Sequence, residues 1–164
     1  MRDFDTDGRL LCELQADTFE LSVDMTSQSS EIFMRRFMHS QIVKSLDNTN
    51  ILVTNLQPKD LLDIIEEQYG PTKYGSNKYS KNEMYWIGYL YRYLSYTREL
   101  SSTQVYRMIK PKTLKSMFLP YHSLDMAQAA ERILESEDIS FYAPDDEREL
   151  NRQYKIFRRI RSES

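Results

Sequence analysis

The segment YGSNKYSKNEMYWIGYLYRYLSYTREL, residues 74–100, decides the fold of this chain. It holds seven of the twelve tyrosines and the only tryptophan, Trp86. Ser80 and Glu83 have the spacing of a capping box, in which each residue's side chain accepts a hydrogen bond from the other's backbone N–H. The spacing therefore predicts a helix over residues 81–99, preceded by a loop.

The two sides of this predicted helix differ in chemistry when residues are placed at about 100° per step. One face carries Ile87, Leu90 and Leu94, and the opposite face carries Tyr85, Tyr89, Arg92 and Tyr96. A face rich in tyrosine and arginine is typical of binding surfaces, but tyrosines also fill buried helix faces. An exposed aromatic patch of that size would lower solubility, so we expect a helix buried on both sides. Gly88 lies on one flank, where a neighbouring helix can approach closely.

The rest of the chain predicts further helices around this one. At 164 residues with four glycines and five prolines, the chain is long enough for one core and poor in turn formers. We predict an all-α, single-domain bundle of about six to seven helices over residues 1–164. Within it we expect a frayed N-terminus over 1–8, a helix over 31–46 and a peripheral C-terminal helix over 145–164. Residues 18–25 fit a helix or a strand, and we choose the helix because no other segment offers a strand partner.

Composition excludes several classes of protein. The single cysteine, Cys12, excludes an internal disulfide and a cysteine-based zinc site. No apolar run approaches the roughly 20 residues of a membrane span, and the acidic N-terminus lacks the apolar core of a signal peptide. We therefore expect a cytoplasmic protein with no metal, no cofactor and no membrane partner.

Charge is distributed unevenly along the chain. Residues 71–115 contain nine lysines and arginines against two glutamates, whereas the remainder contains thirteen basic and twenty-three acidic residues. A basic middle can contact an anionic partner, including nucleic acid. Alternatively, the two parts neutralise each other in the fold. The sequence leaves both interpretations open.

Two sets of residues are candidates for contact with other molecules. For a protein partner we predict contacts from the loop before the central helix and from the helix itself: Tyr74, Asn77, Lys78, Tyr79, Arg92 and Arg98. For nucleic acid, residues 101–119 resemble a helix-turn-helix, with phosphate contacts from Arg107, Lys110, Lys112 and Lys115. However, the turn lacks the glycine that is usual in a helix-turn-helix, and the second helix is short. The basic residues of 101–119 therefore fit a docking surface for an acidic protein at least as well as a nucleic-acid site.

An enzyme of unknown class is the third alternative. The chain lacks a nucleophile motif, a phosphate-binding glycine loop and a paired metal-ligand spacing. We therefore predict no catalytic residues.

Several segments resemble a family of small, poorly characterised Firmicutes proteins. They are MYWIGYLYRYLSYTRELSSTQVYRMI (84–109), PYHSLDMAQAAERILE (120–135), IFMRRFMHS (32–40) and YGSNKY (74–79). Members of that family are often encoded in small operons that look like toxin–antitoxin or defence modules. The resemblance covers about residues 30–136 and implies a bacterial antitoxin-like or accessory protein that binds a protein partner, including a cognate toxin.

Overall fold

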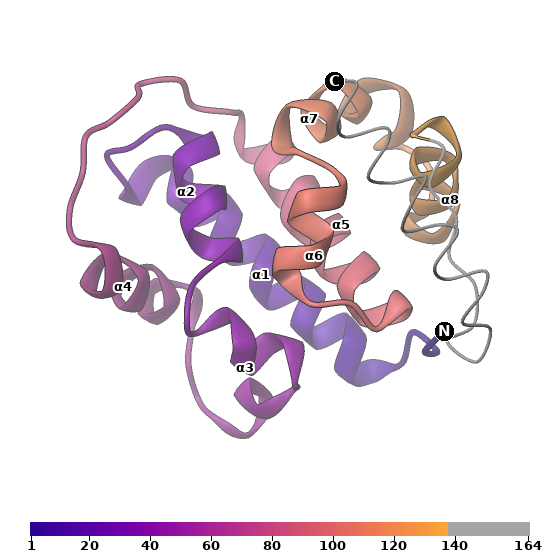
Figure 1. Ribbon diagram of the computed structural model, residues 1–164, viewed down its shortest axis with the longest axis horizontal. Helices are drawn as coiled ribbons and strands as arrows, with labels where there is room; N and C mark the ends of the chain where they lie inside the picture. Colours follow the sequence, from indigo (N-terminus) through magenta and orange to yellow (C-terminus); the bar gives the residue numbers. More distant parts are fainter. Residues whose placement is uncertain (138–164) are drawn as a thin grey trace.

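The computed structural model describes residues 1–137, which form eight α-helices, one short 3-10 helix and, within that range, no strand (Figure 1). The elements are α1 (Thr6–Met25), α2 (Ser30–Met38), α3 (Val43–Asp47), η1 (Asn50–Val53), α4 (Pro58–Tyr69), α5 (Lys81–Arg98), α6 (Ser102–Met108), α7 (Pro111–Tyr121) and α8 (Met126–Ser136). The predicted all-α fold is confirmed, including a helix over residues 18–25. The C-terminal helix predicted over 145–164 lies outside the described residues.

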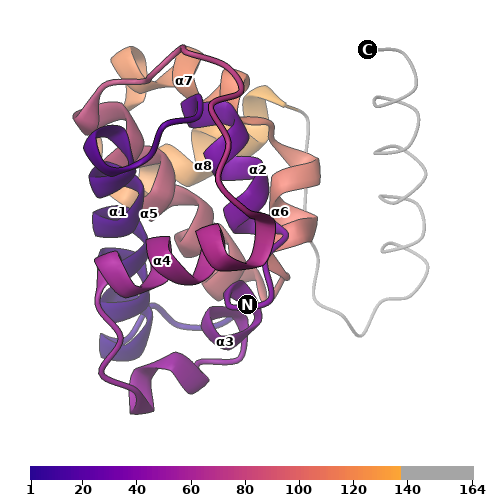
Figure 2. The same cartoon turned by 90° about the vertical axis from the view of Figure 1, so that its left-hand side faces the viewer.

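Helix α5 lies at the centre of the fold, and α1 packs antiparallel along it (Figures 1 and 2). The predicted capping box is present, with Ser80 and Glu83 each accepting from the other's backbone N–H. A Cβ added at Gly88 would lie 2.8 Å from Cγ of Phe19 and 3.1 Å from Cα of Ala16, both on α1. The missing side chain at Gly88 therefore permits the close approach of a neighbouring helix that the sequence predicted, and that helix is α1.

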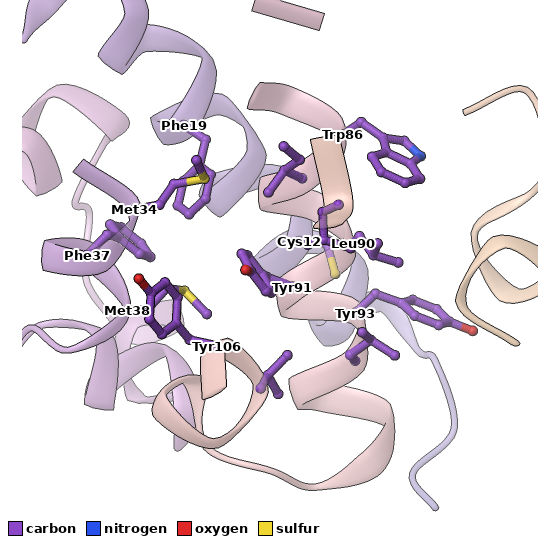
Figure 3. Close-up of a cluster of buried hydrophobic side chains, with 14 of the residues drawn as sticks. Cys12, Phe19, Met34, Phe37, Met38, Trp86, Leu90, Tyr91, Tyr93 and Tyr106 are labelled. Atoms are coloured by element: carbon purple, nitrogen blue, oxygen red, sulfur yellow. The ribbon is translucent and has the colours of Figure 1, made fainter. Parts of the chain in front are cut away.

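Helix α5 carries buried aromatic residues on both of its sides, as expected, namely Trp86, Tyr91, Tyr93 and Tyr96. In Figure 3, Tyr91 points from α5 toward the α2 side, whereas Trp86 and Tyr93 point the opposite way. Tyr91 is fully buried and its hydroxyl donates to the carbonyl of Ile109 at 2.6 Å. On the tyrosine-rich face, Arg92 and Tyr96 are buried, whereas Tyr85 and Tyr89 are half-buried.

The tyrosines of α5 that are buried or half-buried predict a loss of stability at alkaline pH. Burial raises the pKa of Tyr89 to about 12 and that of Tyr91 well above its usual value. A tyrosine whose pKa is higher in the folded state contributes stability below the unfolded-state pKa of about 10, and this contribution is lost as the pH rises. We expect tyrosinate absorbance to appear cooperatively with the loss of helical circular dichroism above that pH. In Tyr91→Phe the pH dependence should be shallower; tyrosinate forming gradually in protein that stays helical would contradict the account.

The N-terminal segment is packed against α5, so the prediction that residues 1–8 are frayed is wrong. Asp5 is the N-cap of α1, its carboxylate accepting from the backbone N–H of Gly8 at 2.9 Å and from the hydroxyl of Tyr96. These two hydrogen bonds, that of Tyr96 first, lower the pKa of Asp5. The backbone N–H of Arg2 donates to the carbonyl of Thr97 at 2.7 Å. The end of α5 supplies partners that the acidic N-terminal sequence does not reveal.

The helix predicted over 31–46 is divided into α2 and α3, which is a second correction. The interruption lies at Ser40, whose hydroxyl donates to the carbonyl of Phe37 at 2.7 Å and accepts from the backbone N–H of Val43 at 3.2 Å. A serine side chain can replace backbone helix hydrogen bonds in this way. The apolar spacing continues across the interruption, which is why periodicity alone predicted one helix.

Candidate functional site

The structure separates the six predicted partner-binding residues. Tyr74 is 74% exposed and Asn77 is also exposed, whereas Lys78 and Arg98 are half-buried and Tyr79 and Arg92 are buried. Helix α5 has 18 residues and is therefore about 27 Å long. Because Arg98 lies at the far end of α5 from the loop that precedes it, Arg98 and Tyr74 do not form one surface.

Arg92 is the centre of a buried polar network and not a partner contact, so that prediction is wrong. Only 1% of its surface is exposed. Its Nε donates to Oε1 of Gln15 at 2.9 Å, its Nη1 to Oδ1 of Asp47 at 2.7 Å, and its Nη2 to Oγ of Ser102 at 2.6 Å. A second Nη1 bond, 3.2 Å long, reaches Oγ of Ser95. The guanidinium thus joins α5 to α1, to α3 and to the start of α6.

Asp47 completes this network. Its carboxylate accepts from both the hydroxyl and the backbone N–H of Ser102, at 2.6 and 3.1 Å. Its side chain is 19% exposed, and it lies 45 residues from Arg92 in the sequence. No local pattern pairs the two residues, so sequence reasoning missed both Asp47 and the role of Arg92.

Lys78 and Tyr79 hold the loop of residues 70–79 in place. The Nζ atom of Lys78 donates to the carbonyl of Thr26 at 2.8 Å and to its hydroxyl at 2.9 Å, at the C-terminal end of α1. Burial lowers the pKa of Lys78. The hydroxyl of Tyr79 donates to Oε1 of Glu31 at 2.8 Å, and its backbone N–H donates to Oγ of Ser30 at 2.9 Å. The predicted partner contacts of these two side chains are therefore replaced by contacts within the protein.

Backbone hydrogen bonds clamp the same loop onto the start of α2. The N–H groups of Ser29 and Ser30 donate to the carbonyls of Tyr74 and Asn77, at 3.1 and 3.0 Å. The first N–H groups of a helix have no partner inside it, and here the loop supplies two of the acceptors. Gly75 has a φ of 75°, and a Cβ added there would lie 2.8 Å from Cβ of Ser29. The 70–79 loop is thus held in place by these contacts, and its Tyr74 side chain is exposed.

A cleft of about 310 Å³ lies beside this loop, and residues from the end of α1, from α2 and from α4 line it. Its apolar lining comes from Phe33, Leu62 and Ile65, all of which are buried. Its polar lining comes from Gln28 and from the charged residues Asp24, Arg36, Lys59, Asp63 and Glu66. The start of the 70–79 loop forms one of its walls. The cleft and Tyr74 therefore belong to one side of the molecule.

The four residues predicted for nucleic-acid contact differ in the contacts that their side chains make within the protein. Arg107 and Lys112 are exposed. Lys110 lies at the N-cap of α7 with its Nζ 4.4 Å from the centre of the Tyr106 ring. Lys115 is exposed but its Nζ lies 3.5 Å from Oε2 of Glu83. Helix α7 begins at Pro111 and extends through Pro120 to Tyr121, so the second helix of the predicted helix-turn-helix has 11 residues.

The structure is thus that of a small all-α protein in which the 70–79 loop, held by hydrogen bonds, exposes Tyr74 beside a polar cleft. Among residues 1–137, no helix is long and apolar enough to cross a membrane, and no group of three or more His, Cys, Asp or Glu side chains could hold a metal ion. The sequence matches no protein-family model, no curated protein and no solved structure. The resemblance to Firmicutes proteins therefore stays a prediction.

Proposed function

We propose that this is a non-enzymatic binding protein that recognises a protein partner through the 70–79 loop, with Tyr74 as the main contact. The observation that carries the proposal is an aromatic side chain, 74% exposed, on a loop whose carbonyls at Tyr74 and Asn77 accept hydrogen bonds from the start of α2. A loop that is ordered before binding loses less conformational entropy when it binds. Tyrosine is also among the residues that contribute most binding energy at protein interfaces.

The resemblance to operon-encoded Firmicutes proteins supports a more specific form of this proposal. In that form the protein is an antitoxin-like or accessory component of a bacterial module, it acts in the cytoplasm, and its partner is a cognate toxin. The single buried cysteine, Cys12, is compatible with a reducing compartment.

Site-specific photocrosslinking in cells tests the proposal. A photoreactive phenylalanine derivative replaces Tyr74 in one variant and Val53 in a control, because Val53 is 90% exposed on η1. We expect one discrete polypeptide adduct from position 74 and none from position 53. With the adducted polypeptide purified, Tyr74→Ala should weaken its binding by about 2 kcal/mol or more, which is about thirtyfold in Kd.

The same experiment separates the alternative, a helix-turn-helix-type regulator that binds nucleic acid through residues 101–119. The exposure of Arg107 and Lys112 favours that alternative. The photoreactive residue at Lys112 would then give a nuclease-sensitive adduct, and binding would fall steeply with salt. Such an adduct, with no polypeptide captured at position 74, would overturn the proposed function.

A further inference from the structure

Tyr106 on α6 is the centre of a group of basic side chains, where the end of α2 packs against α6. The His39 ring lies edge-on to the Tyr106 ring, with 5.0 Å between their centres, and Nζ of Lys110 lies 4.4 Å from the same centre. Arg35 precedes His39 by about one helical turn and lies on the same face of α2. Burial raises the pKa of Tyr106, and the positive charge of the nearby Arg35 acts in the opposite direction. Arg35, His39 and Lys110 therefore lie around one ring.

Arg107 extends this group along α6. The hydroxyl of Thr103 donates to the carbonyl of Met38 at 3.1 Å, so the Thr103 side of α6 lies toward α2. Arg107 is one helical turn after Thr103 and lies on that side of the helix. The basic surface, as we call it, comprises four exposed residues: Arg35, His39, Arg107 and Lys110.

The basic surface carries an excess of positive charge. Arg35 and Arg107 form no ion pair within residues 1–137. The carboxylate that offsets part of this charge is that of Glu31, one helical turn before Arg35, which also acts on Tyr106. Glu31 already accepts a hydrogen bond from the hydroxyl of Tyr79 at 2.8 Å. Two guanidinium groups and one ammonium group against one carboxylate attract an anion.

The charge of the whole chain favours an acidic polypeptide over nucleic acid as that anion. The net charge is −3 at pH 7 and the pI is about 5.5. Domains that bind nucleic acid usually have a pI above about 9, with basic residues along a whole face or helix. Here the basic surface is confined to the contact of two short helices. A long polyanion would be repelled by the rest of the protein, whereas a short acidic segment contacts the basic surface alone.

The basic surface lies on the same helix that holds the 70–79 loop. The backbone N–H of Ser29, the N-cap of α2, donates to the carbonyl of Tyr74 at 3.1 Å. Arg35 and His39 lie about 9 and 15 Å from Ser29 along the axis of α2, at about 1.5 Å per residue. An interface of the usual size, about 800 Å² on each partner, spans such a distance. A partner in contact with Tyr74 can therefore also reach the basic surface.

We propose that the basic surface binds an acidic segment of the partner, one that is rich in aspartate or glutamate. The carboxylates of that segment pair with the guanidinium groups of Arg35 and Arg107, a pairing that is frequently bidentate. The charge of Lys110 adds to the attraction. This inference rests on the proposed function and specifies the chemistry of the partner that contacts Tyr74.

Nuclear magnetic resonance titration of the full chain tests this inference. The probe is N-acetyl-hexaglutamate amide, and the controls are N-acetyl-hexalysine amide and a DNA hexathymidylate. At low salt we expect saturable shifts of the backbone amides of Arg35, His39 and Arg107 with hexaglutamate, at a Kd on the order of millimolar, and none with hexalysine. The shifts should vanish in about 1 M salt, where the Debye length is only about 3 Å.

Two double variants locate the binding. Arg35→Gln combined with Arg107→Gln should weaken the binding of hexaglutamate at least about tenfold, because it removes two of the cations. The matched control is Lys59→Gln combined with Arg132→Gln, which changes the net charge equally at exposed positions on α4 and α8. Since solvent and salt screen charges outside the basic surface, the control should change the Kd by no more than about twofold.

Three outcomes would overturn the inference. They are the absence of a saturable shift with hexaglutamate, equal weakening in the two double variants, and tighter binding of hexathymidylate than of hexaglutamate at the basic surface, which would make it a nucleic-acid site. The result is separable from that of photocrosslinking. A polypeptide adduct at Tyr74, with an affinity that the substitutions of Arg35 and Arg107 leave unchanged, removes the acidic segment and leaves the proposed function. Hexaglutamate binding without an adduct at Tyr74 supports the basic surface and overturns recognition by the loop.

Discussion

Arg92→Met should lower the free energy of unfolding by about 3–4 kcal/mol, because it leaves a mostly buried carboxylate without its cation. Methionine preserves the contacts of the aliphatic part of the side chain but supplies none of the guanidinium donors. Asp47 keeps its bonds from Ser102, whereas Oε1 of Gln15 loses its donor. Since small proteins are stable by about 5–15 kcal/mol in total, this loss is a large fraction of the total free energy of unfolding.

Chemical denaturation of the purified variants measures this effect. Arg107→Met is the matched control, because Arg107 is exposed and its replacement should change the free energy of unfolding by no more than about 0.5 kcal/mol. Adding Asp47→Leu to Arg92→Met should recover part of the loss, since removing both partners leaves no unpaired charge. A loss below about 1 kcal/mol in Arg92→Met would show that the network does not join the helices as described.

Gly75→Ala should release the 70–79 loop from α2 while the helices stay folded. Alanine at a φ of 75° is strained, and its Cβ would lie 2.8 Å from both Cβ and Oγ of Ser29, at the position where the loop carbonyls accept from α2. We expect binding through Tyr74 to weaken as the loop loses its fixed conformation. The measurement is the yield of the Tyr74 adduct, together with helical circular dichroism as the test of folding.

Gly70→Ala is the matched control for that variant. Gly70 also has a positive φ, 81°, but a Cβ added there meets no atom within 4 Å. Both substitutions therefore introduce backbone strain of about 1–3 kcal/mol, and only Gly75→Ala adds a collision with Ser29. Equal adduct yields in the two variants would contradict the role assigned to the hydrogen bonds between the loop and the start of α2.

The elements that the sequence predicted well are those with local signals. The capping box of Ser80 and Glu83 marks the start of α5. Such signals act over three or four residues, so they can be identified without knowledge of the fold. The burial of α5 on both sides could also be predicted, because its apolar and tyrosine faces together surround the helix.

The candidate site was harder to predict because its contacts join distant residues. Arg92 and Lys78 were predicted as partner contacts on the basis of their charge, but their acceptors lie 45 and 52 residues away. The backbone hydrogen bonds that hold the loop likewise join Ser29 and Ser30 to the distant residues Tyr74 and Asn77. Of the partner contacts predicted in the loop, only Tyr74 and Asn77 are exposed, and no periodicity or charge pattern distinguishes them from Lys78 and Tyr79.

The central claim is that the 70–79 loop is ordered before any partner binds, and amide hydrogen exchange at Ser29 and Ser30 tests it most directly. These N–H groups lie at the start of α2, where a helix offers no internal acceptor, so only the loop carbonyls of Tyr74 and Asn77 can protect them. We predict that both exchange much more slowly than in an unstructured peptide, and that Gly75→Ala removes this protection. Exchange of both amides at the unstructured rate in the unchanged protein would contradict the account.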